Sequence, residues 1–416
     1  MRYLFGFICV LALGVVPLVG CTESGGVPCE DDVDCPDDNN ACTEDYCENN
    51  GLCVYMPVEC TADFNDCTAE MCDPSVGCEQ TSVADGTQCA GGTCQTGVCE
   101  LAGSVLPCSE QGIRNAIAAG GDEPYTFDCD GTTPVVTDGT FAINNNVILD
   151  GEGNLTVTGS SLNPFFVVEE EVTAELRRFT VTGGAPLPLP SEKIGEFPAG
   201  SGILNNGTLT MTNSTVSNKP GNGIANGGTL TMTGCTVSGN RGDVLAGGID
   251  NGGTVTMTNS TVSGNTGVFG GIGNGGTLTM ANSTVSGNLA HDPENEASGI
   301  SNAGTLTVTN SLVDGDCSND GVITSNGYNI ESPGNTCGFG QGTDLVNITE
   351  VQLDLVPLQD NRGPTMTHAL GADSVALDRI PEVDCEVETD QRGEPRPETG
   401  GTMCDVGSFE RQPEDL

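Results

Sequence analysis

Five stretches of the chain alternate apolar with hydroxyl side chains, break phase at one position, and then alternate again. The clearest copy reads GGTVTMTNSTVSGN (residues 252–265), and close copies begin at Gly207, Gly228, Gly276 and Gly304. Alternation with a period of two predicts a β-strand, because successive side chains of a strand point to opposite faces. Each copy therefore predicts a strand, a bend at the asparagine or glycine in its middle, and a second, shorter strand.

A third short strand completes each repeat, since a Gly-Ile pair stands before every copy. Neighbouring copies begin between 21 residues (207 to 228) and 28 residues (276 to 304) apart. One such unit cannot bury its apolar face alone, but stacked units can, with like side chains of successive coils in contact. The repeat therefore predicts an all-β fold, a right-handed parallel β-helix of the pectin-lyase-like kind over residues 103–345, with Thr and Ser outside.

The asparagines at the bends are predicted to stack as a ladder of amides from coil to coil. Cys235 replaces the serine that follows the bend in other copies, so we expect a buried, inert thiol there. The alternative architecture is a β-sandwich of hairpins, which needs antiparallel neighbours joined by Asn-Gly turns. That alternative does not explain why the same residue type returns at each position, whereas a solenoid does.

A short helix is predicted before the repeats, in CSEQGIRNAIAAGG (residues 108–121). Ser109 is a suitable N-cap, and Ile113 and Ile117 fall on one face of such a helix. The open end of a solenoid exposes strand edges. We therefore expect this helix to cover that end, with a disulfide Cys108–Cys129 beside it.

The first residues predict an export signal, because an apolar run from Tyr3 to Val19 follows Arg2. The end of that run, LVGC (residues 18–21), resembles the bacterial lipobox, in which a lipid is attached to the cysteine and cleavage occurs before it. The resemblance implies a signal peptide over residues 1–20 and a lipidated Cys21 that anchors the protein to a membrane. An ordinary secretory signal is the alternative.

The residue after Cys21 indicates a location for the protein, and the net charge of the chain excludes one class of partner. Thr22 stands where the inner-membrane retention signal of lipoproteins has Asp, which favours the outer membrane and the cell surface; the periplasmic side is the alternative. Loss of residues 1–20 leaves 11 basic against 58 acidic residues, a difference of −47. Such a charge repels nucleic acid, which we therefore exclude as a partner.

Residues 21–102 form an acidic, cysteine-rich segment without any Lys or Arg. Within it, DNNACTEDYCENNGLC (residues 38–53) is echoed 25 residues later by DFNDCTAEMCDPSVGC (residues 63–78). Cysteines at this density in an exported chain form disulfides, and no apolar run here is long enough to build a core. We expect a row of small knots, each closed by its own bridges, that serves as a spacer.

Calcium is a hypothesis for this segment, because hard cations prefer oxygen ligands. The alternative is that the acids solvate the spacer and stiffen it by mutual repulsion. We favour that alternative and predict no metal site and no cofactor. The calcium hypothesis would use one of two sets, Asp38, Asn40 and Asp45, or Asp63, Asn65 and Glu70.

Three motifs stand near the C-terminus: THAL (residues 367–370), TDQRGEPRP (residues 389–397) and CDVGSFE (residues 404–410). They resemble motifs of the choice-of-anchor Q domain family, β-helical surface proteins with differing anchoring signals. The resemblance implies a cell-surface location but no established activity. We expect residues 346–416 to cap the second open end of the solenoid. The remaining late cysteines are predicted to pair as Cys317–Cys337 and Cys385–Cys404.

Catalysis is one hypothesis, because many parallel β-helices are polysaccharide lyases or glycoside hydrolases. Arg241, Asp243 and Asp250 belong to one coil and could converge, but solvated surface charge is the commoner meaning of such residues. We therefore predict no catalytic residue. A calcium-dependent polysaccharide lyase or glycoside hydrolase remains the alternative function.

Binding is the hypothesis that the loops favour. Insertions fall at one corner of the repeat, before the Gly-Ile strand, and the longest spans residues 183–200. Phe197 and Phe269 are the aromatic residues of this corner. We expect a membrane-anchored surface lipoprotein that displays a β-helical rod for adhesion, glycan binding or envelope structure.

Overall fold

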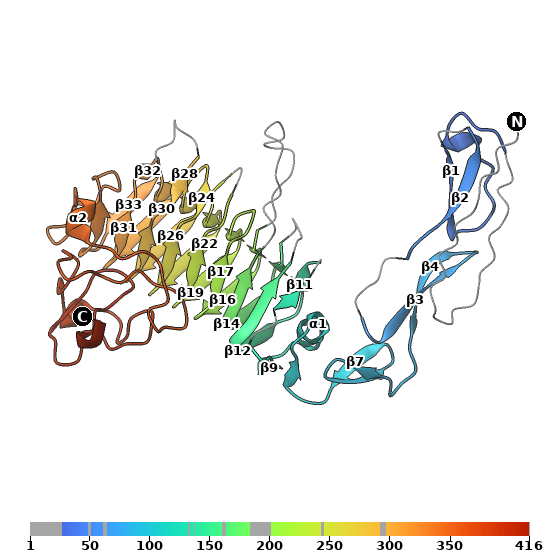
Figure 1. Ribbon diagram of the computed structural model, residues 1–416, viewed down its shortest axis with the longest axis horizontal. Helices are drawn as coiled ribbons and strands as arrows, with labels where there is room; N and C mark the ends of the chain where they lie inside the picture. The colour runs from blue at the N-terminus through green and yellow to red at the C-terminus, as the bar shows by residue number, and fades with distance from the viewer. Residues whose placement is uncertain are drawn as a thin grey trace, which may run out of the picture. The chain divides into compact units, whose positions relative to one another are not determined.

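The chain forms two compact units (Figure 1). The first comprises Met1–Asp63 and Thr68–Ser82, and the second comprises Phe64–Cys67 and Val83–Leu416. Cys21 and the predicted signal peptide lie outside the described residues, and no described helix is long and apolar enough to cross a membrane. The computed structural model describes residues 27–48, 51–60, 65–131, 134–137, 139–159, 164–183, 201–242, 245–291 and 297–415.

The first unit consists of two antiparallel hairpins. β1 (Thr43–Cys47) pairs with β2 (Cys53–Pro57), and β3 (Thr68–Asp73) pairs with β4 (Gly77–Ser82). Among the described side chains of this unit, Cys53 alone is buried. Disulfides must therefore stabilise the unit in place of an apolar core. A short 3-10 helix, η1 (Asp32–Asp34), precedes the hairpins.

The disulfides of the first unit correct the prediction that each repeat closes on itself. Cys42 of the first repeat bonds to Cys72 of the second. The two repeats pack together at this point, since the Ala41 amide donates to the Pro74 carbonyl at 2.8 Å. Cys42 and Cys72 are therefore close enough to form a disulfide. The other bridges are Cys29–Cys47, Cys35–Cys53 and Cys60–Cys78.

The second unit begins inside the expected spacer. A three-stranded antiparallel sheet packs on the helix that follows it, where Asn115 Nδ2 donates to the Ala90 carbonyl at 2.8 Å. Disulfides Cys67–Cys94 and Cys89–Cys99 lie in this region. The second unit therefore includes Phe64–Cys67 and the residues from Val83 onward, which composition assigned to the spacer. The strands are β5 (Gln88–Cys89), β6 (Gly92–Gln95) and β7 (Val98–Leu101).

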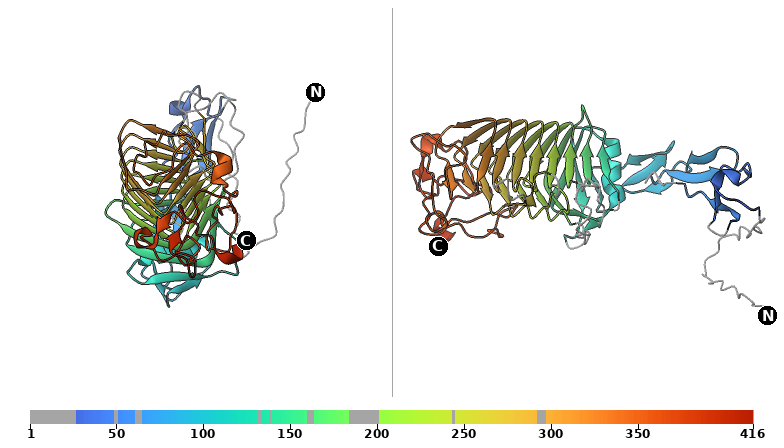
Figure 2. Two further views of the ribbon diagram at one scale, coloured as in Figure 1. Left: turned by 90° about the vertical axis from the view of Figure 1, so that its left-hand side faces the viewer. Right: turned by 90° about the horizontal axis from the view of Figure 1, so that it is seen from above.

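The predicted parallel β-helix is confirmed, with three columns of parallel strands that each receive one strand per coil (Figures 1 and 2). We call them sheet A, an eight-stranded sheet, and columns B and C, which meet at the bends. Two long strands, β12 (Val147–Thr158) and β14 (Thr173–Thr182), pass through both columns B and C. At the start of the solenoid lie β8 (Val105–Pro107), β9 (Pro124–Asp128) and β10 (Val135–Val136).

The repeating strands of each column have nearly constant length. Sheet A contains β11 (Phe141–Ile143), β13 (Phe166–Val168), β15 (Ile203–Asn205), β18 (Ile224–Asn226), β21 (Ile249–Asn251), β25 (Ile272–Asn274), β29 (Ile300–Asn302) and β32 (Cys317–Asn319). Column B contains β16 (Thr208–Thr212), β19 (Thr229–Thr233), β22 (Thr254–Thr258), β26 (Thr277–Ala281), β30 (Thr305–Thr309) and β33 (Val322–Ser325). Column C contains β17 (Thr215–Ser217), β20 (Thr236–Ser238), β23 (Thr261–Ser263), β27 (Thr284–Ser286), β31 (Leu312–Asp314) and β34 (Ile330–Ser332).

Like side chains stack along the interior. In register, Leu209 lies beside Leu230 and Met211 beside Met232, and all four are at most 1% exposed. Each fully buried side chain of this kind contributes about 1.5–3 kcal/mol to folding. The alternation in the sequence thus translates into a continuous core that no single coil could form.

Amide ladders exist, but not at the bends where they were predicted. They run through the last residue of the sheet A strands from β15 to β32, where Asn226 Nδ2 donates to Asn251 Oδ1 at 2.8 Å, and through the turn after column C. The bend residues, such as Asn213 and Asn259, instead adopt positive φ angles of 50° and 47°. Asparagine suits a bend because it tolerates this left-handed conformation better than most residues.

The predicted helix closes the first end of the solenoid. α1 (Glu110–Ala119) is capped by Ser109, whose side chain accepts from the Gly112 amide, and it buries Ile113 and Ile117 in the solenoid core. The disulfide Cys108–Cys129 joins the residues on either side of it.

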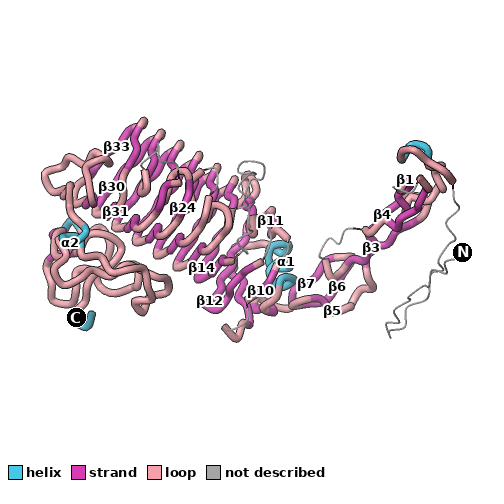
Figure 3. Tube along the Cα trace, turned by 45° about the horizontal axis from the view of Figure 1, so that its top comes forward, coloured by secondary structure: helices cyan, strands magenta, loops and turns pink. Residues whose placement is uncertain are grey.

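The C-terminal segment does not simply cap the second end. Cys337, bonded to Cys317, and Phe339 pack into the end of the solenoid core. The chain then folds back over the outer surface of column C, because Leu312 and Ile330 there are apolar and pack with Ile348. Figure 3 shows that most of this segment is loop. Its short elements are α2 (Glu350–Leu353), β35 (Ile380–Pro381), η2 (Glu382–Asp384), β36 (Met403–Cys404) and η3 (Pro413–Asp415), with the disulfide Cys385–Cys404.

The C-terminal motifs dock this segment on the solenoid. Gln391 reaches column C, where it accepts from Thr261 Oγ1 at 2.6 Å and donates to Thr236 Oγ1 at 2.9 Å. Arg396 forms a buried ion pair with Glu410 at 3.0 Å. The residues that resemble the family motifs thus have a packing role in this protein.

Candidate functional site

The outer surface of sheet A carries the carboxylate of Asp250 and is bordered by the loops that precede its strands. Its outward positions, taken along the sheet, are Leu204, Ala225, Asp250, Gly273 and Ser301. The loops that precede these strands lie at the same corner, so the surface is bordered by variable segments.

Asp250 lies beside an aromatic ring above a glycine. A Cβ placed on Gly273 would stand 3.4 Å from Asp250 Oδ1, 3.5 Å from Phe269 Cδ2 and 3.3 Å from Ala246 Cβ. Three side chains therefore converge over β25, and a larger residue at position 273 would crowd them. We call these four residues the Asp250 site.

Burial raises the pKa of the half-buried Asp250 carboxyl above its ordinary value. The cause is the loss of solvent around the carboxyl. A carboxylate next to a ring can accept hydrogen bonds from hydroxyl groups while the ring contacts C–H groups, which are the two chemistries that a sugar offers.

The loop corner has an apolar rim. β24 (Thr266–Gly267) and β28 (Leu289–Ala290) pair in parallel there, outside the three main columns. Leu245 and Leu289 remain 42% and 60% exposed on these loops.

Two of the three residues considered under the catalysis hypothesis, Arg241 and Asp250, are among the described residues and lie in different parts of the coil. Asp250 projects from sheet A, whereas Arg241 lies in the turn after column C, bridged to Thr266. Asp243 and most of the long loop that contains Phe197 lie outside the described residues. Asp250 is the one carboxylate of this trio among the described residues.

Five repeat strands of column B carry no acid or base. The strands β16, β19, β22, β26 and β30 consist of Thr, Leu, Val, Met and Ala and contain no ionisable side chain. General acid–base catalysis on these five strands is therefore excluded.

Ser263 of column C and His368 of the C-terminal segment form a pair that the sequence analysis did not predict. His368 Nε2 lies 2.8 Å from Ser263 Oγ, and its Nδ1 lies 2.7 Å from the Val356 carbonyl. The geometry matches that of a nucleophile and its base. Both side chains are buried beneath the C-terminal segment, at 3% and 6% exposure, so the pair docks that segment. The THAL motif, which contains His368, was the feature of the sequence that could have indicated this contact with Ser263.

Asp405 and Glu410 are buried carboxylates of the C-terminal segment itself. Burial and the neighbouring Glu410 raise the pKa of Asp405 to about 7. Its oxygens accept from the amides of Asp378 and Arg411 at 2.8 and 2.7 Å. Glu410 is bound by Arg396. These contacts satisfy both carboxylates, which tie loops together.

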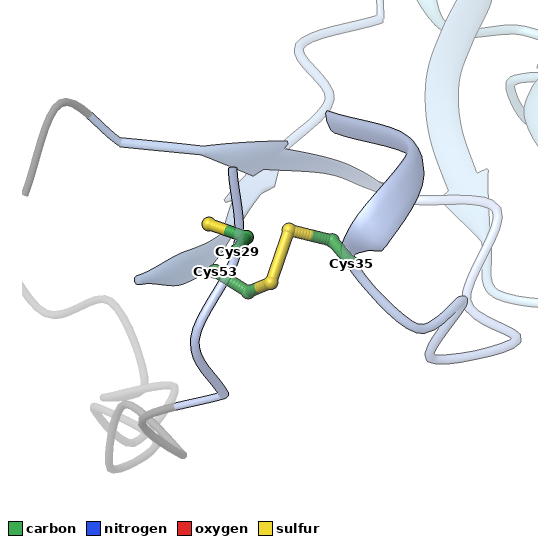
Figure 4. A group of neighbouring side chains, drawn as sticks. All are labelled: Cys29, Cys35 and Cys53. Carbon is green, nitrogen blue, oxygen red and sulfur yellow. A yellow bond between two sulfur atoms is a disulfide. The ribbon is translucent and has the colours of Figure 1, made fainter. Parts of the chain in front are cut away.

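The cysteine clusters of the first unit are not thiolate metal sites. Figure 4 shows Cys29, Cys35 and Cys53 close together, but Cys35 and Cys53 share a disulfide and Cys29 is bonded to Cys47. A sulfur in a disulfide is no zinc ligand.

The proposed calcium ligands are rearranged in part. One oxygen each of Asp37, Asp38 and Asp45 lies within 4.8 Å of the others, so two members of the first set of the calcium hypothesis are close together. Asn40 instead caps its own turn, accepting from the Cys42 amide at 3.1 Å. Asp63 of the second set lies outside the described residues, and Asn65 accepts from the Cys67 amide at 2.9 Å.

The comparisons with known proteins concern the fold. No protein-family model and no curated protein matches the chain. Among solved structures, the crystal structure of pectate lyase Pel9A is similar at 12% sequence identity and a TM-score of 0.34. The likeness covers 71% of this chain and 90% of the pectate lyase.

Proposed function

We propose that this protein is a lipid-anchored surface protein of the bacterial outer membrane whose β-helix binds polysaccharide without cleaving it. The observation that carries the proposal is the Asp250 site, where a carboxylate and a ring converge over Gly273 on the loop-bordered surface. The sequence before Cys21 supports the lipid anchor, and the resemblance to choice-of-anchor Q domains supports the cell surface. The many disulfides agree with a location outside the cytoplasm.

Binding is tested with the soluble chain from Thr22 onward and a panel of neutral and acidic polysaccharides, with and without calcium. We expect retarded migration in native gels and polymers of unchanged length. Asp250→Asn and Phe269→Ala should weaken retardation at least tenfold, because each removes one contact with the sugar. Thr256→Val, on column B, is the matched control and should bind as the unaltered protein does.

Shortened polymer would contradict the proposal and favour the lyase or hydrolase alternative. Retardation that Asp250→Asn and Phe269→Ala leave unchanged would move binding away from the Asp250 site.

The anchor has its own test in the full chain. Cys21→Ser removes the acceptor of the lipid, so the protein should leave the membrane fraction and become soluble. A variant that stays with the outer membrane would refute lipid anchoring at Cys21, whatever the outcome for polysaccharide.

A further inference from the structure

Three antiparallel strand pairs of the cysteine-rich segment each carry two cysteines directly opposite each other in strand register. Opposite residues of a sheet have their Cα atoms about 4.5–5.5 Å apart, a separation that a disulfide can span. The two members of a pair nevertheless do not bond to each other, and each is bonded to a cysteine outside the pair. The pairs are Cys47 and Cys53, Cys72 and Cys78, and Cys94 and Cys99.

Each of these strand pairs also brings two disulfides next to each other. Cys72 is bonded to Cys42, and its Sγ lies within 4.8 Å of both sulfurs of the disulfide Cys60–Cys78. A thiolate released at Cys72 therefore stands beside a disulfide that it can attack, without diffusion through solution. The same arrangement recurs for Cys29 beside Cys35–Cys53 (Figure 4) and for Cys89 beside Cys67–Cys94.

The group formed by Cys42, Cys60, Cys72 and Cys78, which we call the middle group, is the most open to solvent. Cys78 is exposed and the other three cysteines are half-buried, whereas each of the other two groups contains a buried cysteine. A dissolved thiol therefore reaches the middle group most readily. Its disulfide Cys42–Cys72 joins the hairpin β1–β2 to the hairpin β3–β4, so a change of partners here changes how the hairpins are linked.

The alternative partners in the middle group lie on the same hairpin. The Val58 amide donates to the Cys42 carbonyl at 2.7 Å, so Cys60 follows two residues after the position opposite Cys42. A bond between Cys42 and Cys60 would close the first hairpin. A bond between Cys72 and Cys78 would close the second hairpin across its register pair.

We propose that the middle group is a thiol-triggered disulfide switch that uncouples the two hairpins. The co-reactant is a low-molecular-weight thiol, whose thiolate attacks Cys42 Sγ, forms a mixed disulfide there and releases the Cys72 thiolate. Cys72 then attacks Cys78 Sγ, which forms Cys72–Cys78 and releases the Cys60 thiolate. Cys60 finally attacks the mixed disulfide at Cys42, which forms Cys42–Cys60 and returns the thiol.

The exchange needs no net oxidant or reductant, because two disulfides are broken, two are formed and the thiol is regenerated. Afterwards each hairpin is closed separately, and the hydrogen bond from Ala41 to Pro74 is a noncovalent contact between them. The proposal is independent of polysaccharide binding.

The exchange is tested on the chain from Thr22 onward with reduced glutathione at a concentration well below that of the protein. Samples are quenched in acid, blocked at free thiols, and digested without reduction by proteases that cut before Asp and after Glu. We expect mass spectrometry to show Cys42–Cys60 and Cys72–Cys78 appearing together, in equal amounts that exceed the glutathione added. The digestion places the four cysteines of the middle group in separate peptides, residues 38–44, 60–62, 71–72 and 73–79.

The disulfide Cys108–Cys129 is the matched control. Both of its cysteines are half-buried, and no third cysteine sulfur among the described residues lies within 4.8 Å of both. Exchange in the middle group should be at least tenfold faster than the loss of Cys108–Cys129. Unchanged pairing in the middle group, equal rates for the two, or glutathione adducts of Cys42 without new pairs would overturn the proposal.

The double variant Cys42→Ser, Cys60→Ser tests the exchanged state without added thiol. It leaves Cys72 and Cys78 as each other's partners, so we expect them to bond and the count of free thiols to equal that of the unaltered chain. Two additional free thiols in a chain whose other disulfides are intact would overturn the proposal.

Discussion

At the scale of single residues, Lys219 stands inside the solenoid where the next three coils have asparagine. The backbone amide of Lys219 donates to Asn240 Oδ1, as the amides of the asparagines do in the turn after column C. Its side chain takes no part in that ladder. Its ammonium lies 3.1 Å from the centre of the Phe165 ring without a hydrogen-bond partner, and the residue is 1% exposed. Burial lowers the pKa of Lys219 to about 8.

Lys219→Asn should stabilise the protein at pH 7 by about 3 kcal/mol. The folded pKa lies below the unfolded one, so the charge opposes folding fully below pH 8, and this penalty disappears as the pH rises towards 10.5. Urea unfolding at pH 7 and pH 10 measures the difference. Lys219→Met, which removes the charge without adding an amide, is the control, and a variant less stable than the unaltered protein at pH 7 would contradict the explanation.

Cys235 is the other unusual interior residue. It is fully buried, burial raises the pKa of its thiol to about 12, and it is free, as the sequence predicted. Iodoacetamide at pH 8 should leave it unlabelled in the folded protein and label it after denaturation, because the thiolate is the reactive form. Mass spectrometry of the peptide reads out the labelling, and modification of the folded protein would show that the site opens.

At the scale of elements, the amide ladder ties sheet A together along its length. Asn251 accepts from Asn226 Nδ2 and donates to Asn274 Oδ1, at 2.8 and 2.7 Å. Asn251→Ala leaves Asn274 Oδ1 buried without its donor, while Asn226 Nδ2 keeps the Gly228 and Thr254 carbonyls, so the variant should cost about 3 kcal/mol in urea unfolding. Asn319→Ala, at the exposed end of the ladder, should cost less than half as much. Equal costs would mean that the ladder does not act as a chain of bonds.

The contact between the C-terminal segment and column C should be sensitive to acid. Burial lowers the pKa of His368 below its usual value, against a weaker opposing effect of Asp314. Stability from the neutral imidazole is therefore present above about pH 6.5, the unfolded value, and is lost as the pH falls below it. Because the raised pKa of Asp405 in the same segment acts in the opposite direction, the contribution of His368 is measured as the difference between the unaltered protein and His368→Gln, which does not titrate. In hydrogen exchange at pH 7.5 and pH 5, corrected for intrinsic rates, the change from neutral to acid should reduce protection of the segment more in the unaltered protein than in His368→Gln.

At the scale of the whole molecule, the two units depend on different forces. The solenoid buries a continuous apolar core, whereas the first unit buries Cys53 alone among its described side chains. Reduction with a thiol reagent should therefore unfold the first unit while the solenoid keeps its far-ultraviolet signal. Limited proteolysis after reduction would show cleavage before residue 83. Loss of both units together would contradict this division.

The sequence alone determined the solenoid, because its period of two and its repeated Leu, Met and Val positions permit one way of burying apolar surface. It also determined the capping helix and the late disulfides, whose partners lie close along the chain. Local pattern sufficed wherever a residue's partner was its own copy in the next coil.

Tertiary structure decided the rest. Cys42 pairs with Cys72 because two hairpins pack together, and neither repeat contains that information. The C-terminal segment covers column C because Leu312 and Ile330 present an apolar surface there. Asp250 acquires its surroundings from Ala246, Phe269 and the absence of a side chain at Gly273. Contacts between segments that do not repeat produce no periodic pattern in the sequence. These contacts could therefore be identified only in the folded structure.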